Sequence, residues 1–148
     1  MEVIIIYEVN QSWGYLLSKI AQDMAESFTK ELAHYEISSR DFGILSAIYN
    51  NENLTQKGIG FELKIDRTTM VQLIDHLESK TLLKRVSNPA DRRANLIRIT
   101  EEGRTILEKR WEALERCEKD VIYQMTAHQK KAIKDIYHYL QKEELEND

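Results

Sequence analysis

Proline, cysteine and glycine are scarce in this chain of 148 residues, which holds one proline, one cysteine and five glycines. Because proline and glycine interrupt helices and mark turns, their scarcity predicts a mainly helical protein with few loops. The single cysteine, Cys117, excludes an intramolecular disulfide and a cysteine-based zinc site. It is compatible with a reducing compartment.

Long hydrophobic runs are also missing. No stretch approaches the roughly 20 apolar residues that a membrane-spanning helix needs. Residues 1–8 are apolar but few, and Glu2 and Glu8 bracket them without a basic flank, so we expect no signal peptide. We therefore expect a cytoplasmic protein with no membrane partner. Residues 1–10 are either an extended arm packed on a partner or on the helices, or a loose segment.

Signatures of catalysis and of metal binding are absent from the sequence. It has no glycine-rich phosphate loop, no nucleophile elbow and no HExxH spacing. The four histidines include no pair at i,i+4, although a site shared between two subunits stays open; they are His34, His76, His128 and His138. We predict no enzyme activity, no cofactor and no metal.

The charge of the chain is unevenly distributed. The whole sequence has a formal net charge of −4 at pH 7. Residues 64–98 nevertheless contain eight lysines or arginines and only four acidic residues. Since phosphate binding depends on local positive potential, this basic segment is a candidate contact for nucleic acid.

We predict two short helices here, one directly before this basic segment and one inside it. Thr55 can cap a helix that ends near Leu63, and Asp66 or Thr68 can cap a second helix. The second helix carries apolar residues at helical spacing on one face, namely Met70, Leu73, Ile74 and Leu77. Its opposite face is polar, with donors and acceptors that suit base edges. This pattern predicts a helix–turn–helix.

A β-hairpin is predicted directly after the second helix. Residues 83–87 and 95–100 are rich in β-branched residues and leucine, and Asn88-Pro89 between them indicates a turn. The turn is basic, with Arg92 and Arg93 near its tip. A helix–turn–helix followed by such a hairpin is the order of a winged helix–turn–helix.

The segment resembles the MarR family of winged-helix transcription regulators. Three stretches carry the resemblance: residues 54–57, residues 68–78, and Asp91-Arg92-Arg93 with Ile99-Thr100-Glu101-Glu102-Gly103. The resemblance covers roughly residues 11–142. It implies that Arg93 enters a minor groove and that Asp91 orients the basic tip.

The predicted DNA contacts come from the second helix and the wing. They are Arg67, Thr68, Thr69, Gln72, Lys84, Arg85, Asp91, Arg92 and Arg93. Gln72 can pair with adenine, and Arg67 with guanine or phosphate. Val71 and Gln72 occupy positions where the family commonly has threonine and arginine, which leaves the target sequence open. Thr81 replaces the glycine that usually ends this helix.

Long helices flank the DNA-reading segment. Apolar residues recur every three or four positions in residues 11–35, and the apolar run from Leu107 to Met125 is close to a heptad spacing. A single winged helix offers too little surface to bury them, so we predict a homodimer. The expected organisation is one domain, 1–148, with dimerisation helices at 11–35 and 101–146 around a winged helix–turn–helix at 38–100.

The family resemblance implies a small aromatic effector bound beside the dimerisation helices. The candidate lining residues are Trp13, Tyr15, His34, Tyr35 and Trp111, although aromatic residues at helical spacing are more often core. Cys117 lies between charged neighbours in a dimerisation helix, where a passive thiol is expected.

These observations predict a sequence-specific, DNA-binding transcription regulator. We expect a homodimeric repressor of a prokaryotic cytoplasm that binds palindromic double-stranded DNA and is released by an effector. The alternative is a dimeric winged-helix protein-interaction module without specific DNA binding, and the basic tip at Arg92 and Arg93 argues against it.

Overall fold

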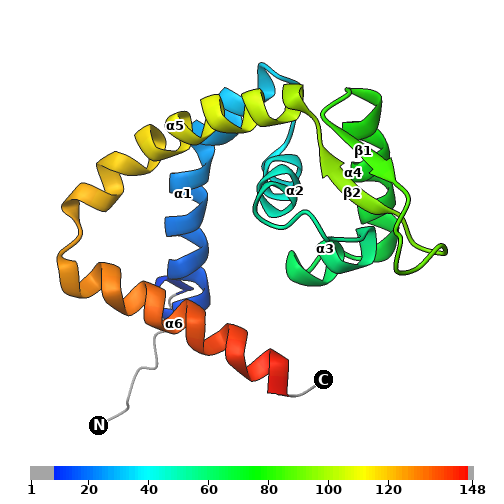
Figure 1. Cartoon of the computed structure of the whole chain (residues 1–148). Helices are drawn as coiled ribbons and strands as arrows, with labels where there is room; N and C mark the ends of the chain where they lie inside the picture. The colour runs from blue at the N-terminus through cyan, green and yellow to red at the C-terminus, as the bar shows by residue number, and fades with distance from the viewer. Residues whose placement is uncertain (1–8, 147–148) are drawn as a thin grey trace, which may run out of the picture. The chain divides into compact units, whose positions relative to one another are not determined.

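The computed structural model describes residues 9–146, and its contacts divide the chain into two compact units. The central unit is Glu26–Leu114, and the terminal unit combines Met1–Ala25 with Glu115–Asp148. The elements follow one another along the chain as in Figure 1: η1 (Val9–Gln11), α1 (Trp13–Ala33), α2 (Ser39–Asn50), α3 (Gln56–Glu62), α4 (Arg67–Ser79), β1 (Leu83–Val86), β2 (Leu96–Ile99), α5 (Glu101–Gln124) and α6 (Ala127–Glu146). The predicted mainly α fold with a small β-hairpin is confirmed.

A capping box starts α2 where the sequence predicted it. The Ser38 hydroxyl accepts a hydrogen bond from the Asp41 amide, and the Asp41 carboxylate accepts one from the Ser38 amide at 2.8 Å. Two of the amides that a helix start leaves without partners are thereby satisfied. The helix then buries Phe42, Ile44 and Ile48 in the core of the central unit.

Side-chain caps also define the helix–turn–helix. Thr55 accepts a hydrogen bond from the Gly58 amide and starts α3, and Asp66 accepts one from the Thr69 amide and starts α4. The turn between the two helices passes through Lys64, whose φ of 53° lies in the left-handed region. Of the two caps that the sequence allowed for the second helix, the structure uses Asp66.

The hairpin packs its apolar residues against the helices of the central unit. Strands β1 and β2 are antiparallel, with Leu83 opposite Ile99 and Val86 opposite Leu96. Strand β2 contacts α2, and β1 contacts α4 (Figure 1). Because Leu83 and Ile97 are almost fully buried, the strands hold the wing in place beside α4.

The junction between α4, the hairpin and α5 is tightly packed. Thr81 follows α4 with a φ of 61°, a conformation that favours glycine, and the Thr100 hydroxyl donates to its carbonyl at 2.6 Å. Gly103 lies so close to the chain that an added Cβ would be 2.1 Å from the Leu82 carbonyl oxygen. Only glycine fits at this start of α5.

The terminal unit contrasts with the central one in burial. Every buried apolar side chain of the described residues belongs to the central unit, from Phe28 to Ala113. In the terminal unit several large apolar side chains are exposed to solvent: Trp13, Leu17, Ile20, Tyr123, Ile133, Ile136, Tyr137, Tyr139 and Leu140. Of residues 1–10, for which the sequence left an extended arm or a loose segment open, residues 1–8 lie outside the described residues, and Val9 and Asn10 belong to η1. Within residues 9–146 no helix is long and apolar enough to cross a membrane.

Candidate nucleic-acid interface

Helix α4 has one buried face and one exposed polar face. Met70, Ile74 and Leu77 are at most 1% exposed and anchor the helix in the central unit. Arg67 and Gln72, on the other side, are exposed, and so is Thr68. These three predicted contacts therefore share a surface that is accessible to a ligand.

Thr69 differs from the other predicted contacts of α4. It is half-buried, and its amide donates to the Asp66 carboxylate at 3.0 Å. Hydrogen bonds from the Thr69 side chain and amide lower the pKa of Asp66. The structure thus places Thr69 in the helix cap, and its contact with DNA stays a prediction.

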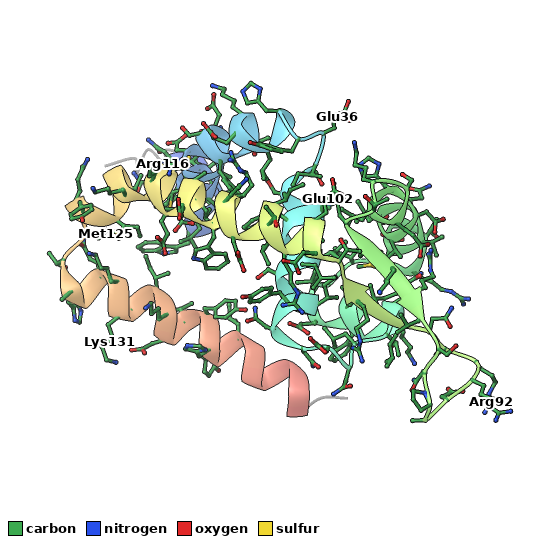
Figure 2. The ribbon with its side chains drawn as sticks, turned by 45° about the horizontal axis from the view of Figure 1, so that its top comes forward. Glu36, Arg92, Glu102, Arg116, Met125 and Lys131 are labelled. Atoms are coloured by element: carbon green, nitrogen blue, oxygen red, sulfur yellow. The ribbon has the colours of Figure 1, made fainter. Side chains whose placement is uncertain are left out.

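The tip of the wing is basic and exposed. Figure 2 shows Arg92 at the far end of the loop between β1 and β2. The Arg93 amide donates to the Asp91 carboxylate at 2.9 Å, and the Arg93 guanidinium lies 3.6 Å from the same oxygen. Asp91 thus folds the tip while the Arg93 side chain stays 95% exposed. Lys84 is exposed on β1.

Arg85 is half-buried and bound by two carboxylates, unlike the other basic residues that we predicted as contacts. Its guanidinium bonds to the Asp75 carboxylate at 2.5 Å and to the Glu78 carboxylate, and its amide donates to Glu78 at 3.0 Å. Burial opposes the guanidinium charge, but the hydrogen bond to Asp75 and the Glu78 charge outweigh it and raise the pKa of Arg85. Arg85 therefore ties the wing to α4.

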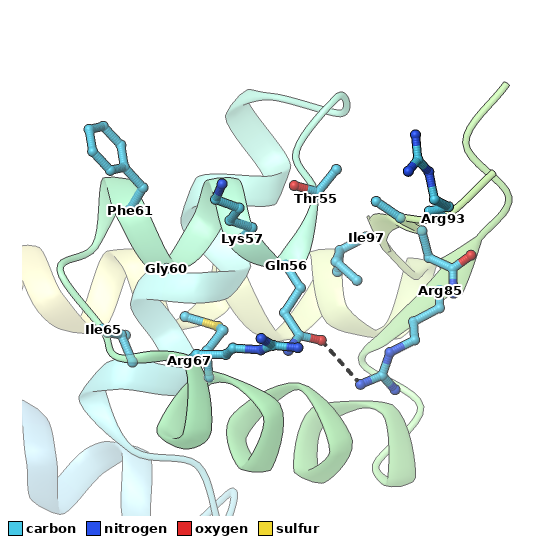
Figure 3. Close-up of a pocket in the computed structure, with 13 residues that line it drawn as sticks. Thr55, Gln56, Lys57, Gly60, Phe61, Ile65, Arg67, Arg85, Arg93 and Ile97 are labelled. Carbon is cyan, nitrogen blue, oxygen red and sulfur yellow. Dashed lines mark hydrogen bonds between the residues drawn. The ribbon is translucent and has the colours of Figure 1, made fainter. Parts of the chain in front are cut away.

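A cavity of about 730 Å³ lies between the helix–turn–helix and the wing. Four basic residues line it: Lys57 from α3, Arg67 from α4, Arg85 from β1 and Arg93 from the wing. Figure 3 shows these side chains and a hydrogen bond of 3.5 Å from Arg85 to Gln56. The remaining lining residues are Thr55, Gly60, Phe61, Ile65, Met70, Ala94, Asn95 and Ile97. An anionic chain that follows this cavity would meet positive charge from α3, α4 and the wing.

Lys57 was missed as a site residue by the sequence analysis. It is exposed on α3, one turn before Phe61, which is 63% exposed. Its place in the first helix of the helix–turn–helix was a usable signal, since that helix crosses the DNA backbone in such motifs. The sequence could not show that the wing brings Arg93 to the same cavity.

A second set of contacts fixes the C-terminal half of α4. Lys80 pairs with the Glu36 carboxylate at 2.5 Å, and His76 Nε2 lies 3.1 Å from the Glu36 carbonyl oxygen. The hydrogen bond and charge of Lys80 lower the pKa of Glu36. Helix α4 is thus tied to the α1–α2 connection at one end and to the wing through Arg85.

The five predicted effector residues are divided between the two units. Trp13 and Tyr15 belong to the terminal unit, whereas His34, Tyr35 and Trp111 belong to the central unit. Trp111 stacks on Phe42 at 6.0 Å, and the Arg110 guanidinium lies 4.3 Å from the Tyr35 ring. Neither the cavity beside the wing nor a smaller one at the start of α2 is lined by any of the five.

The described part of the chain was also compared with the predictions for metal ligands and for Cys117. No group of three or more histidine, cysteine or acidic residues within residues 9–146 could hold a metal ion. Cys117 is a free, half-buried thiol in α5.

The sequence that forms this surface is similar to sequences of known proteins. Residues 35–94, which include the helix–turn–helix and most of the wing, match the sequence model of the MarR family. YdgJ of Bacillus subtilis, an uncharacterized HTH-type transcriptional regulator, is 26% identical over 100 residues, which are 68% of this chain and 61% of YdgJ. The chain spans between about half and three fifths of the length of the curated relatives it matches first.

Solved structures share the fold of almost the whole chain. The S. aureus MepR–DNA complex has a TM-score of 0.77 at 22% identity and covers 89% of this chain and 98% of MepR. CouR from Rhodococcus jostii RHA1, solved with p-coumaroyl-CoA, has a TM-score of 0.79 at 23% identity and covers 92% of this chain and 94% of CouR. These likenesses show a common fold.

Proposed function

We propose that this chain, whose residues 35–94 match the MarR family, is a sequence-specific DNA-binding transcription regulator. The observation that carries the proposal is the convergence of Lys57, Arg67 and Arg93 on one cavity between the helix–turn–helix and the wing. Such a basic surface binds the phosphate backbone, and the exposed face of α4 reads base edges in the major groove.

The basic residues of the hairpin and its tip have three different roles in this proposal. Arg93 enters the adjacent minor groove, where a narrow A·T-rich segment concentrates negative potential. Arg92 and Lys84 contact phosphates. Arg85 sets the position of the wing relative to α4, because Asp75 and Glu78 already occupy its guanidinium. We propose this positioning role for Arg85, and the DNA contact that the sequence predicted for it stays a prediction.

We propose a homodimer as the active species. The exposed apolar side chains of α6, including Ile133, Ile136 and Leu140, need a partner surface, and the described terminal unit buries no side chain of its own. A twofold dimer places two copies of α4 in successive major grooves, roughly 10 bp apart, on a palindromic site. Occupying a promoter in this way blocks transcription without a further partner, which favours repression.

A small aromatic molecule is proposed as the effector that releases the DNA. CouR is solved with p-coumaroyl-CoA and PcaV of Streptomyces coelicolor with its natural ligand. The aromatic candidates here are Trp13, Tyr15, His34, Tyr35 and Trp111. A ligand of this kind can act only if its affinity differs between the DNA-bound and the free conformation. We further propose that the protein works in the cytoplasm and is not an enzyme.

Selection of binding sites from a random duplex library tests this function. The purified full chain should enrich a twofold-symmetric sequence with half-site centres about 10 bp apart. Lys131→Ala is a matched control, since Lys131 is paired with Asp135 on α6, and it should enrich the same sequence. Recovery of no consensus, with equal binding to all duplexes, would reject a sequence-specific regulator and favour the interaction module.

A further inference from the structure

Val71 is the exposed one among the large apolar side chains of α4. Met70, Ile74 and Leu77 are at most 1% exposed and Leu73 is half-buried, but Val71 is 38% exposed. It lies one turn after Thr68 and directly before Gln72, and both of these residues are exposed too. Val71 is therefore an apolar group in the middle of the polar surface that faces DNA in the proposed function.

Helix stability does not account for a valine at this position. A β-branched side chain loses rotamer freedom in a helix, so valine has a lower helix propensity than alanine or glutamine. Val71 also lies outside the buried core of the central unit. Isolated exposed apolar residues are common on protein surfaces, so the meaning of Val71 depends on the chemistry of its neighbours and of the groove.

The major groove presents one apolar group in unmodified DNA, the C5-methyl group of thymine. The two methyl groups of valine can neither donate nor accept hydrogen bonds, so they would leave the polar edge of another base without a partner. The nearest acid on the same face, Asp75, is ion-paired with Arg85 at 2.5 Å, which reduces its repulsion of phosphates near Val71.

We propose that Val71 is a specificity-determining residue that selects thymine by contact with its C5-methyl group. This inference rests on the proposed function, because it needs α4 in the major groove. Gln72, which we expect to pair with adenine, adds hydrogen-bond readout beside the apolar contact. The two residues together favour an A·T-containing half-site.

Replacement of thymine by deoxyuridine tests the contact, because it removes only the methyl group. In the selected site, each thymine is replaced singly in both half-sites, and binding of the full chain is measured by fluorescence anisotropy. One thymine per half-site should show a loss of about fourfold per half-site, the value for removing one buried methyl-sized group from its contact. Val71→Ala should remove the sensitivity at that thymine.

Two further variants control for indirect effects. Gln72→Ala should weaken binding but keep the deoxyuridine sensitivity at the same thymine, because it leaves Val71 in place. Val71→Thr has almost the same shape with a hydroxyl in place of one methyl, and it should keep a reduced sensitivity. The Tm of Val71→Ala should not fall and should rise slightly, since the side chain is outside the core and alanine has the higher helix propensity.

The possible results separate this inference from the function on which it rests. Full deoxyuridine sensitivity in Val71→Ala, or no sensitive thymine in a site that the wild-type protein selects, would overturn the role of Val71 alone. Failure of the wild-type protein to prefer any sequence would instead overturn the proposed function.

Discussion

The basic residues of residues 64–98 differ in whether their charge is paired within the protein or exposed to solvent. Arg85 and Arg93 both belong to the wing region, but Arg85 is bound by Asp75 and Glu78, whereas the Arg93 side chain is 95% exposed. The family resemblance predicted a minor-groove contact for Arg93, and Arg85 was predicted as a further DNA contact, but the sequence did not predict the ion pairs of Arg85. The distinction depends on the fold, because only the packing of β1 against α4 brings Arg85 to the two carboxylates.

The salt dependence of DNA binding distinguishes these two arginines. Arg93→Ala should lower affinity tenfold or more and reduce the slope of log K against log salt by about 1.8, because the dimer loses two cationic side chains at the DNA, one in each half-site. The double variant Asp75→Asn/Arg85→Gln keeps the net charge and should weaken binding without changing the slope. Fluorescence anisotropy across a salt series measures both. A reduced slope in the double variant would show that Arg85 contacts phosphate.

The junction of α4, the wing and α5 leaves no space for a Cβ atom at Gly103. Gly103→Ala would place Cβ 2.1 Å from the Leu82 carbonyl oxygen, so we expect a loss of about 1–3 kcal/mol in the free energy of unfolding. In Gly43→Ala the nearest atom is 3.9 Å away, and stability should rise by up to about 1 kcal/mol. Urea unfolding checks the pair, and equal stability of the two variants would contradict the packing at Gly103.

At the scale of elements, local sequence signals predicted the helices and strands well. The caps at Ser38, Thr55 and Asp66 start α2, α3 and α4 because capping depends only on residues three positions away. The hairpin follows from β-branched residues on both sides of Asn88-Pro89. Local sequence signals could not predict contacts between residues far apart in the chain, since these depend on tertiary packing. Lys80 with Glu36 and His76 with the Glu36 carbonyl are examples.

The cap of α4 gives the protein a pH dependence of stability. The pKa of Asp66 is lowered by hydrogen bonds from Thr69, so its contribution is complete above the ordinary value of 3.8 and is lost as the pH falls through the folded pKa. Asn caps helices without titrating. Asp66→Asn should therefore show a smaller decrease in Tm below pH 4 than the wild-type protein. If circular-dichroism melts show the same decrease in Tm for Asp66→Asn and the wild-type protein, the Asp66 cap does not cause the pH dependence.

For the whole molecule, the central unit holds the described core, and the terminal unit exposes its apolar side chains. The periodic apolar residues of the terminal helices predicted that these helices need a partner, and the exposed apolar side chains of α6 agree with this. The sequence could not predict where the five aromatic effector candidates lie, because their division between two units depends on tertiary contacts.

Disruption of α6 should separate dimerisation from the DNA-reading surface. Ile136 is 58% exposed, and Ile136→Glu would place a charge in the proposed dimer interface. We expect a monomer by sedimentation equilibrium, with DNA binding strongly reduced because only one half-site is engaged. Lys57→Glu, a charge change in the cavity of the central unit, should stay dimeric and lose DNA binding. A dimeric Ile136→Glu protein would contradict the α6 interface.

Anisotropy with the DNA upstream of the protein's own gene tests the central claim most directly. Binding is measured across a salt series beside a scrambled duplex of the same composition. We predict tight binding that prefers the upstream sequence and weakens steeply as salt rises, because several phosphates exchange counterions for basic side chains. Absence of binding to either duplex at low salt would contradict the assignment of the cavity and wing as a DNA interface.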